Sequence, residues 1–303
     1  MSKILRAFLI ISSAVLLFLI VFLYRQVVDI SQPFPLEGKN PPLSEKPLYY
    51  FGVISRYPPT LIYQGYQPIM DYLNQTTPYH FELRLSKSYR QTVHQLVSGK
   101  VVAAFLGSFL FAKDGKRYHL HCILKPLNKE RKPLLRAVVI TQATKRIHGL
   151  SDLKGKKVAL PSRLSFSTNW FLHRALPQNK LKVSDLDSLH IFAHHFTVVY
   201  EVLKGHFDAG VVKDRVAQGF LNRGIRIVAQ SHPIPASPIV VSERSPKAVV
   251  QAIRKSLLAV DPRKPEYRKI VSTWDAEFSQ GFVPAKESDY QILQPLVRLS
   301  EGR

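Results

Sequence analysis

Residues 136–168 constrain the fold more than any other stretch of the chain. An apolar β-branched run, Val138–Ile140, leads through a short capped segment and a basic turn into a second strand that ends at Pro161. A cluster of hydroxyl side chains then opens a helical pattern (Ser162, Ser165, Ser167 and Thr168). Free backbone N–H groups, the helix dipole and nearby hydroxyls all favour negative charge at such a helix start. The stretch therefore predicts a strand that delivers an anion site.

The first 30 residues are a separate, strongly apolar segment. Residues 7–24 form an 18-residue stretch without a charge, with Lys3 and Arg6 before it and Arg25 after it. This length is at the short end of what spans a bilayer, and it exceeds a typical signal-peptide core. The basic flank predicts one N-terminal transmembrane helix, an uncleaved signal anchor over residues 1–30, with the N-terminus in the cytoplasm and the folded body outside. A cleaved signal peptide, which would release the body from the membrane, is the alternative.

A proline-rich stretch over residues 31–47 follows this anchor. It holds five prolines and almost no periodic apolar pattern, so we expect a linker that is semi-rigid where the prolines cluster.

The chain is strongly basic, with 43 Lys and Arg against 21 Asp and Glu and a formal net charge of +22. The basic residues are spread along the chain, and no RNP, zinc-finger or helix-turn-helix pattern accompanies them. A nucleic-acid partner is therefore not expected. A diffuse positive field suits an extracytoplasmic protein that handles small anions or lies near an anionic membrane. A simple solvated basic surface remains an equal alternative.

Strand and helix patterns alternate along the body of the chain. The first half predicts strands at 48–54, 81–85 and 101–106, separated by helices at 65–74 and 89–97. This βαβαβ order predicts an α/β sheet with parallel strands.

The same order recurs in the second half, with strands at 189–192 and 207–212 around a helix at 197–203. Two halves of similar size and order, with chain crossings near Ile140 and Pro238, predict a hinged two-lobed protein. Lobe 1 would comprise residues 48–140 and 238–303, and lobe 2 residues 141–237. The ligand of such a protein is expected in the cleft between its lobes.

The chain resembles the periplasmic solute-binding proteins for phosphate, phosphite and phosphonate that serve ABC importers. The resemblance runs from about Tyr50 to Trp274, and its markers are the segments 51–55, 88–108, 149–161, 193–212 and 234–241. The strand-turn motif at 149–161 is common to many proteins of the class II periplasmic-binding fold. The histidine segment that ends in Gly-x-x-Asp-Ala-Gly is more specific to this family. The resemblance thus implies a two-lobed α/β fold with a hinge and an interlobe cleft.

The resemblance also implies a ligand site, which consists of Tyr89, Gly107, Ser108, Ser165, Ser167, Thr168 and His195. The phenol of Tyr89 would hydrogen-bond a phosphoryl oxygen, and the imidazole N–H of His195 would donate to the anion, better still if protonated. Leu106 stands where the family has an aromatic residue. Ser237 lies in the segment where aminophosphonate binders have an acid, so a simpler oxyanion is favoured over a zwitterion.

Each of these residues also has a purely structural interpretation. The hydroxyl cluster can serve as a helix N-cap, and Tyr89 can be a packing residue. The pair His194 and His195 lacks the further ligands that zinc requires, so no metal is expected. A hydrolytic triad of Ser167, His195 and Asp208 has no nucleophile elbow to support it. We therefore expect neither catalytic residues nor a cofactor.

The function predicted from the sequence is capture of a small phosphorus oxyanion (phosphate, phosphite or phosphonate) for an ABC importer, with its permease as partner. Binding is expected to use neutral hydrogen-bond donors and a helix dipole with little direct countercharge. The alternative is a membrane-tethered sensory or scaffold module of the same fold that reports ligand occupancy to a partner protein.

Overall fold

A computed structural model describes residues 16–17 and 46–302 of the chain. The expected signal anchor, apart from residues 16–17, and nearly all of the expected linker lie outside the described residues. Residues from Lys46 onward form one compact unit. Within the described ranges, no helix is both long and apolar enough to cross a membrane.

The first sheet contains six strands in the order β13-β4-β12-β3-β1-β2. Its strands are β1 (Leu48–Val53), β2 (His80–Leu85), β3 (Ala103–Phe105), β4 (Leu120–Pro126), β12 (Ile239–Ser242) and β13 (Phe282–Pro284). Strand β1 runs parallel to both β2 and β3, as the βαβαβ pattern predicts. Strand β12 lies antiparallel between β3 and β4, so a late segment of the chain inserts into the middle of this sheet.

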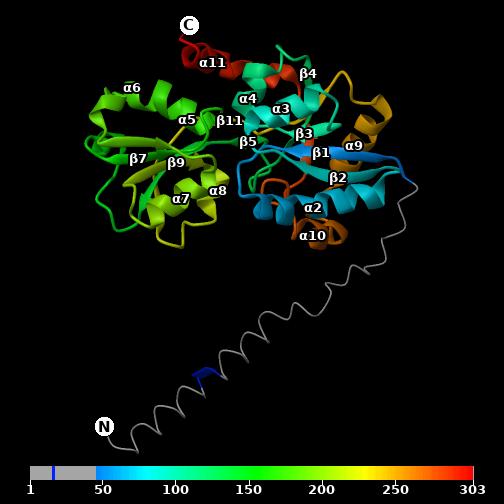
Figure 1. Cartoon of the computed structure of the whole chain (residues 1–303), viewed down its shortest axis with the longest axis horizontal. Helices are drawn as coiled ribbons and strands as arrows, with labels where there is room; N and C mark the ends of the chain where they lie inside the picture. The colour runs from blue at the N-terminus through cyan, green and yellow to red at the C-terminus, as the bar shows by residue number, and fades with distance from the viewer. Residues whose placement is uncertain (1–15, 18–45, 303) are drawn as a thin grey trace, which may run out of the picture. The chain divides into compact units, whose positions relative to one another are not determined.

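Helices and short helical turns surround the first sheet (Figure 1). They are α2 (Pro59–Thr76), α3 (Tyr89–Val97), α4 (Ser108–Asp114), α9 (Lys247–Ala259), α10 (Pro265–Val271), the 3₁₀ segment η4 (Glu287–Leu293) and α11 (Gln294–Ser300). Helix α3 has the bounds expected from the sequence. Helix α2 starts earlier than expected, because Pro59 is well tolerated at the first helical position, where its missing N–H is not needed.

The second sheet contains five strands in the order β10-β6-β9-β7-β8. Its strands are β6 (Ala137–Gln142), β7 (Lys157–Leu160), β8 (Ser188–Ile191), β9 (Ala209–Lys213) and β10 (Ile225–Gln230). Helical elements cover both faces (Figure 1). They are η1 (Leu150–Leu153), α5 (Phe166–Trp170), the π-helical turn η2 (Phe171–Ala175), α6 (Leu176–Gln178), η3 (Val183–Asp185), α7 (His195–Leu203) and α8 (Asp214–Gln218).

Gly210 on β9 allows helix α7 to pack closely against the second sheet. A Cβ at this position would lie 2.6 Å from a methyl carbon of Val198 and 2.9 Å from one of Val202, closer than real side chains approach. This close packing brings the start of α7 to the end of β9. His195 and Lys213 therefore become neighbours.

A two-stranded ribbon joins the sheets, formed by β5 (Leu134–Leu135) and β11 (Ile234–Pro235) (Figure 1). The chain crosses into the second sheet immediately after β5 and returns to the first sheet after β11. The lobe boundary predicted between residues 140 and 141 falls inside β6, which starts at Ala137 and pairs wholly within the second sheet. The boundary predicted between 237 and 238 falls in the short connection from β11 to β12.

Candidate functional site

Loops from both sheets meet around a small enclosed cavity of about 30 Å³. Its lining consists of Ile54, Arg56, Tyr89, Gly107, Ser108, Leu135, Ser165, Phe166, Ser167, His195, Lys213 and Ser237. One water molecule needs about 10–15 Å³ on the same measure. The cavity therefore has room for a group of a few heavy atoms.

The structure brings together most of the site residues named from the sequence. Tyr89, Gly107, Ser108, Ser165, Ser167 and His195 all line the cavity, whereas Thr168 does not. The buried hydroxyl of Thr168 donates to the carbonyl of Pro161 at 2.7 Å. For Thr168, the structural interpretation is therefore the one that its contacts support.

Neighbouring serines at the start of α5 have different roles. The hydroxyl oxygen of Ser165 accepts from the backbone N–H of Thr168 at 3.1 Å, which is an N-cap bond. Ser167 is buried at 2% exposure, and its hydroxyl has no hydrogen-bond partner among the described residues. A buried hydroxyl beside a cavity with no protein partner is available to a bound ligand.

His195 presents one defined nitrogen as a donor. Its Nδ1 accepts a hydrogen bond from the backbone N–H of Lys213 at 3.2 Å, so the ring proton must lie on Nε2. Burial, together with the charges of Lys213 and Arg56, lowers the pKa of His195 to about 3. The imidazole is therefore neutral near pH 7, and it would donate to a ligand as a neutral ring.

The hydroxyl of Ser108 is already engaged. It donates to the carbonyl of Pro235 in β11 at 2.7 Å and so connects the loop after β3 to the ribbon between the sheets. In this conformation the Ser108 hydroxyl can only accept a further hydrogen bond. Leu106 is fully buried and lies outside the cavity lining, so this position supplies no hydroxyl donor to the cavity.

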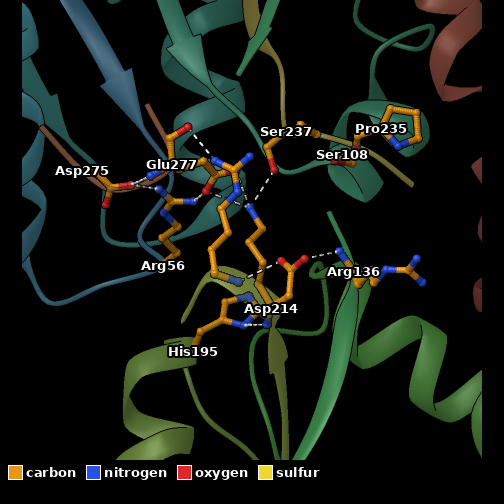
Figure 2. A network of polar contacts seen from close by, with 12 residues as sticks. Arg56, Ser108, Arg136, His195, Asp214, Pro235, Ser237, Asp275 and Glu277 are labelled. Carbon is orange, nitrogen blue, oxygen red and sulfur yellow. Dashed lines mark hydrogen bonds and ion pairs between the residues drawn. The ribbon is translucent and has the colours of Figure 1, made fainter. Parts of the chain in front are cut away.

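The cavity lining also includes two cationic side chains that sequence reasoning missed, Arg56 and Lys213. The guanidinium of Arg56 donates to the carboxylate of Glu277 and to Asp275 Oδ1, the latter at 3.0 Å (Figure 2). The ammonium of Lys213 donates to Glu277 at 2.8 and 3.0 Å and to Ser237 Oγ at 2.9 Å. The expectation of neutral donors with little countercharge did not include these two cations.

Glu277 stands behind these two cations as a shared counterion. It is 2% exposed and is absent from the cavity lining. Burial alone would raise the pKa of Glu277, but the charges of Arg56 and Lys213 outweigh burial and hold this pKa well below its usual value. Burial lowers the pKa of Lys213 to about 8 against the opposing charge of Glu277.

The same carboxylate links the two sheets. Glu277 follows α10 and packs beside the first sheet, whereas Lys213 ends β9 and Arg215 is the second residue of α8 beside the second. Arg215 also donates to the main-chain oxygen of Glu277 at 2.6 Å. Nδ1 of His194 lies 2.6 Å from the carbonyl oxygen of Ser55 and adds a further contact across the cleft.

One feature of the sequence pointed to this cluster, namely where Arg56 and Lys213 stand along the chain. Arg56 and Lys213 each stand at the carboxyl end of a buried strand, where functional side chains of α/β sheets gather. Nothing local marked Glu277. Within the described part of the chain, no group of His, Cys, Asp and Glu is arranged to hold a metal ion.

Comparison with known proteins gives one family match and many similar structures. The sequence profile of the family described as "ABC transporter, phosphonate, periplasmic substrate-binding protein" matches residues 51–290. The binding protein component of an ABC phosphonate transporter from Pseudomonas aeruginosa superposes with a TM-score of 0.75 at 15% identity, over 85% of this chain and 87% of its own.

Two further structures carry bound ligands. PhnD1 of Prochlorococcus marinus, solved with methylphosphonate, gives a TM-score of 0.71 at 13% identity, over 84% of this chain and 99% of that one. A Xanthomonas citri protein solved with ATP gives a TM-score of 0.62 at 20% identity, over 84% and 97% of the two chains. These likenesses show that the chain has the two-lobed α/β periplasmic-binding fold.

Proposed function

Because the chain belongs to the family of periplasmic substrate-binding proteins of ABC phosphonate transporters, we propose that its enclosed cavity binds the phosphorus oxyanion group of the transported solute. A protein of this family is a solute receptor and not an enzyme, and its partner is an ABC permease. The proposal rests on one observation, which is that residues from separate segments of the chain line the same cavity. They are Tyr89, Ser167, His195, Arg56 and Lys213.

The lining suits an anion with several acceptor oxygens. Tyr89 and Ser167 supply hydroxyl groups without hydrogen-bond partners among the described residues, and His195 supplies its Nε2–H. Arg56 and Lys213 add positive charge to the lining, part of which the carboxylate of Glu277 behind them already offsets. Gly107 and Ser165 shape the wall, and Ser108 contributes backbone. We leave Thr168 out of the proposed ligand-binding set.

The charge of the lining limits which ligands the cavity can bind. The cavity lining includes two cations and no Asp or Glu, and the carboxylate of Glu277 behind them is already bonded to both, so a ligand ammonium group would find no carboxylate in the lining. A simple phosphorus oxyanion is therefore favoured over a zwitterionic aminophosphonate. The cavity of about 30 Å³ fits a tetrahedral head group, and the methylphosphonate complex of the Prochlorococcus marinus protein supports a ligand of this size.

We also infer that each sheet is the centre of one lobe, with residues near Arg136 and Pro238 acting as the hinge. Ligand binding would add donors from both lobes to the contacts that Glu277 already makes across the cleft. Residues 1–30 would tether this body to the periplasmic face of the inner membrane. N-terminal sequencing of membrane and soluble fractions tests the tether, which a mature N-terminus beyond residue 24 would refute.

Thermal unfolding of the full-length chain in detergent, with and without ligand, tests the binding proposal. Methylphosphonate, phosphite and phosphate are the probes, and sulfate is the comparison anion. A specific ligand at 100 times its dissociation constant adds about 2.7 kcal/mol to the free energy of unfolding. If no phosphorus acid shifts the melting temperature beyond the effect of sulfate, the proposal is wrong.

A further inference from the structure

A wide groove of about 710 Å³ opens beside the enclosed cavity of about 30 Å³. Tyr89 lines both spaces, so the groove continues outward from the point where an oxyanion group would sit. Because the cavity has room for only a few heavy atoms, any larger part of a ligand must lie in the groove.

Three basic side chains stand on the lining of this groove. Lys87 and Arg90 flank the capped start of α3 beside the first sheet, and Arg163 follows β7 of the second sheet. All three are exposed, and none forms an ion pair among the described residues. The groove lining contains no Asp or Glu.

The floor of the groove is partly apolar. Leu164, Leu189, Ile191 and Phe192 contribute half-buried side chains to it. A short carbon chain can contact this floor and leave water, while a charged group at the end of the chain meets the basic residues. The arrangement is asymmetric in charge, so it favours a negative terminal group and disfavours a positive one.

We propose that the groove binds the organic substituent of the ligand and selects one that carries a second acidic group, such as a carboxylate on a short alkyl chain. This inference rests on the proposed function, because it takes the phosphorus oxyanion to occupy the cavity. It adds a ligand class, the acidic phosphonates, and assigns its recognition to Lys87, Arg90 and Arg163.

Paired ligands test the inference with the full-length chain by titration calorimetry at 0.15 M salt. Propylphosphonate and 3-phosphonopropionate have carbon chains of the same length and differ by the terminal carboxylate. We expect 3-phosphonopropionate to bind about tenfold more tightly, as two or three exposed charge contacts allow. Equal affinities for the two ligands would overturn the inference.

The variant Lys87→Gln/Arg90→Gln/Arg163→Gln should bring the ratio of the two affinities close to one. A matched control, Arg223→Gln/Arg254→Gln/Lys255→Gln, removes the same charges from exposed positions outside the groove lining and should keep the ratio. If the control variant loses the preference as fully, the preference comes from the overall positive field and the inference is wrong. If wild-type protein binds methylphosphonate or phosphate but not 3-phosphonopropionate, or binds propylphosphonate alone, only the inference is refuted. If it binds none of these phosphorus acids, the proposed function of the cavity fails and the inference fails with it.

Discussion

The enclosed cavity and the outer groove share Tyr89, yet they manage positive charge in opposite ways. In the cavity, Arg56 and Lys213 are buried, and both are bonded to the carboxylate of Glu277. In the groove, the basic side chains are exposed and carry no ion pair within the described residues. Buried charges require partners because desolvation is costly, whereas exposed charges are solvated and need none. The ion pairs of the cavity therefore hold Arg56 and Lys213 in fixed positions. The unpaired charges of the groove instead attract an anionic ligand from a distance.

The largest expected effect comes from removing the counterion of the cavity. Glu277→Gln leaves Arg56 and Lys213 buried without their shared carboxylate, and losing one partner of a buried ion pair typically costs about 3–5 kcal/mol of unfolding free energy. Urea denaturation measures this loss. The control Asp261→Asn removes a surface carboxylate paired with Arg263 and Arg131 and should lower the free energy of unfolding far less. Equal losses in the two variants would contradict the proposed role of Glu277.

Adjacent residues at the start of α5 should separate affinity from stability. Ser167→Ala removes a hydroxyl without a protein partner, so affinity for methylphosphonate should fall about 10- to 100-fold while the unliganded melting temperature stays constant. Thr168→Ala breaks the bond to Pro161, and its unfolding free energy should fall by about 1 kcal/mol with affinity nearly retained. Calorimetry and thermal unfolding of both variants test this contrast. The reverse pattern would exchange the roles of the two residues.

The neutral state of His195 predicts a loss of stability in acid. Its pKa is lowered to about 3 in the folded protein from the ordinary value of 6.5, so between these values the unfolded chain binds one proton more. The neutral ring therefore contributes its full stabilisation above pH 6.5, and this contribution is lost as the pH is lowered toward 3. Over that range the equilibrium constant for unfolding rises by up to about tenfold per pH unit. Urea titrations across this range should show a slope reduced by one proton in His195→Gln. An unchanged slope in His195→Gln would show that the ring is not held neutral.

The smallest expected effect concerns the rate of ligand capture. Arg163→Gln removes one exposed charge from the groove, so the association rate of methylphosphonate should fall about twofold at low salt, with the dissociation rate little changed. Stopped-flow measurements at low and high salt should show this difference vanish as salt screens the field. Lys255→Gln, outside the groove, should leave the rate unchanged. An equal decrease in that variant would assign the attraction to the whole surface.

The sequence by itself determined the features that depend on short-range patterns. The alternation of apolar segments predicted strands and helices in the right order, and the capped start and glycine stop of α3 set its bounds from Tyr89 to Val97. The hydroxyl-rich helix start and His195 were visible because caps and motif spacing are local. Six of the seven site residues that the family resemblance named line one cavity in the structure.

Tertiary structure alone decided which of these groups are free and which charges accompany them. Arg56 and Glu277 are 221 residues apart in sequence and meet because the chain returns to the first sheet after visiting the second. Ser167 and Thr168 look equivalent in the sequence, but Pro161 supplies a partner to only one of them. Strands and caps follow from local periodicity and propensity, whereas partners and burial depend on how distant segments pack. For that reason most residues of the candidate site could be named in advance, and the buried charges beside them could not.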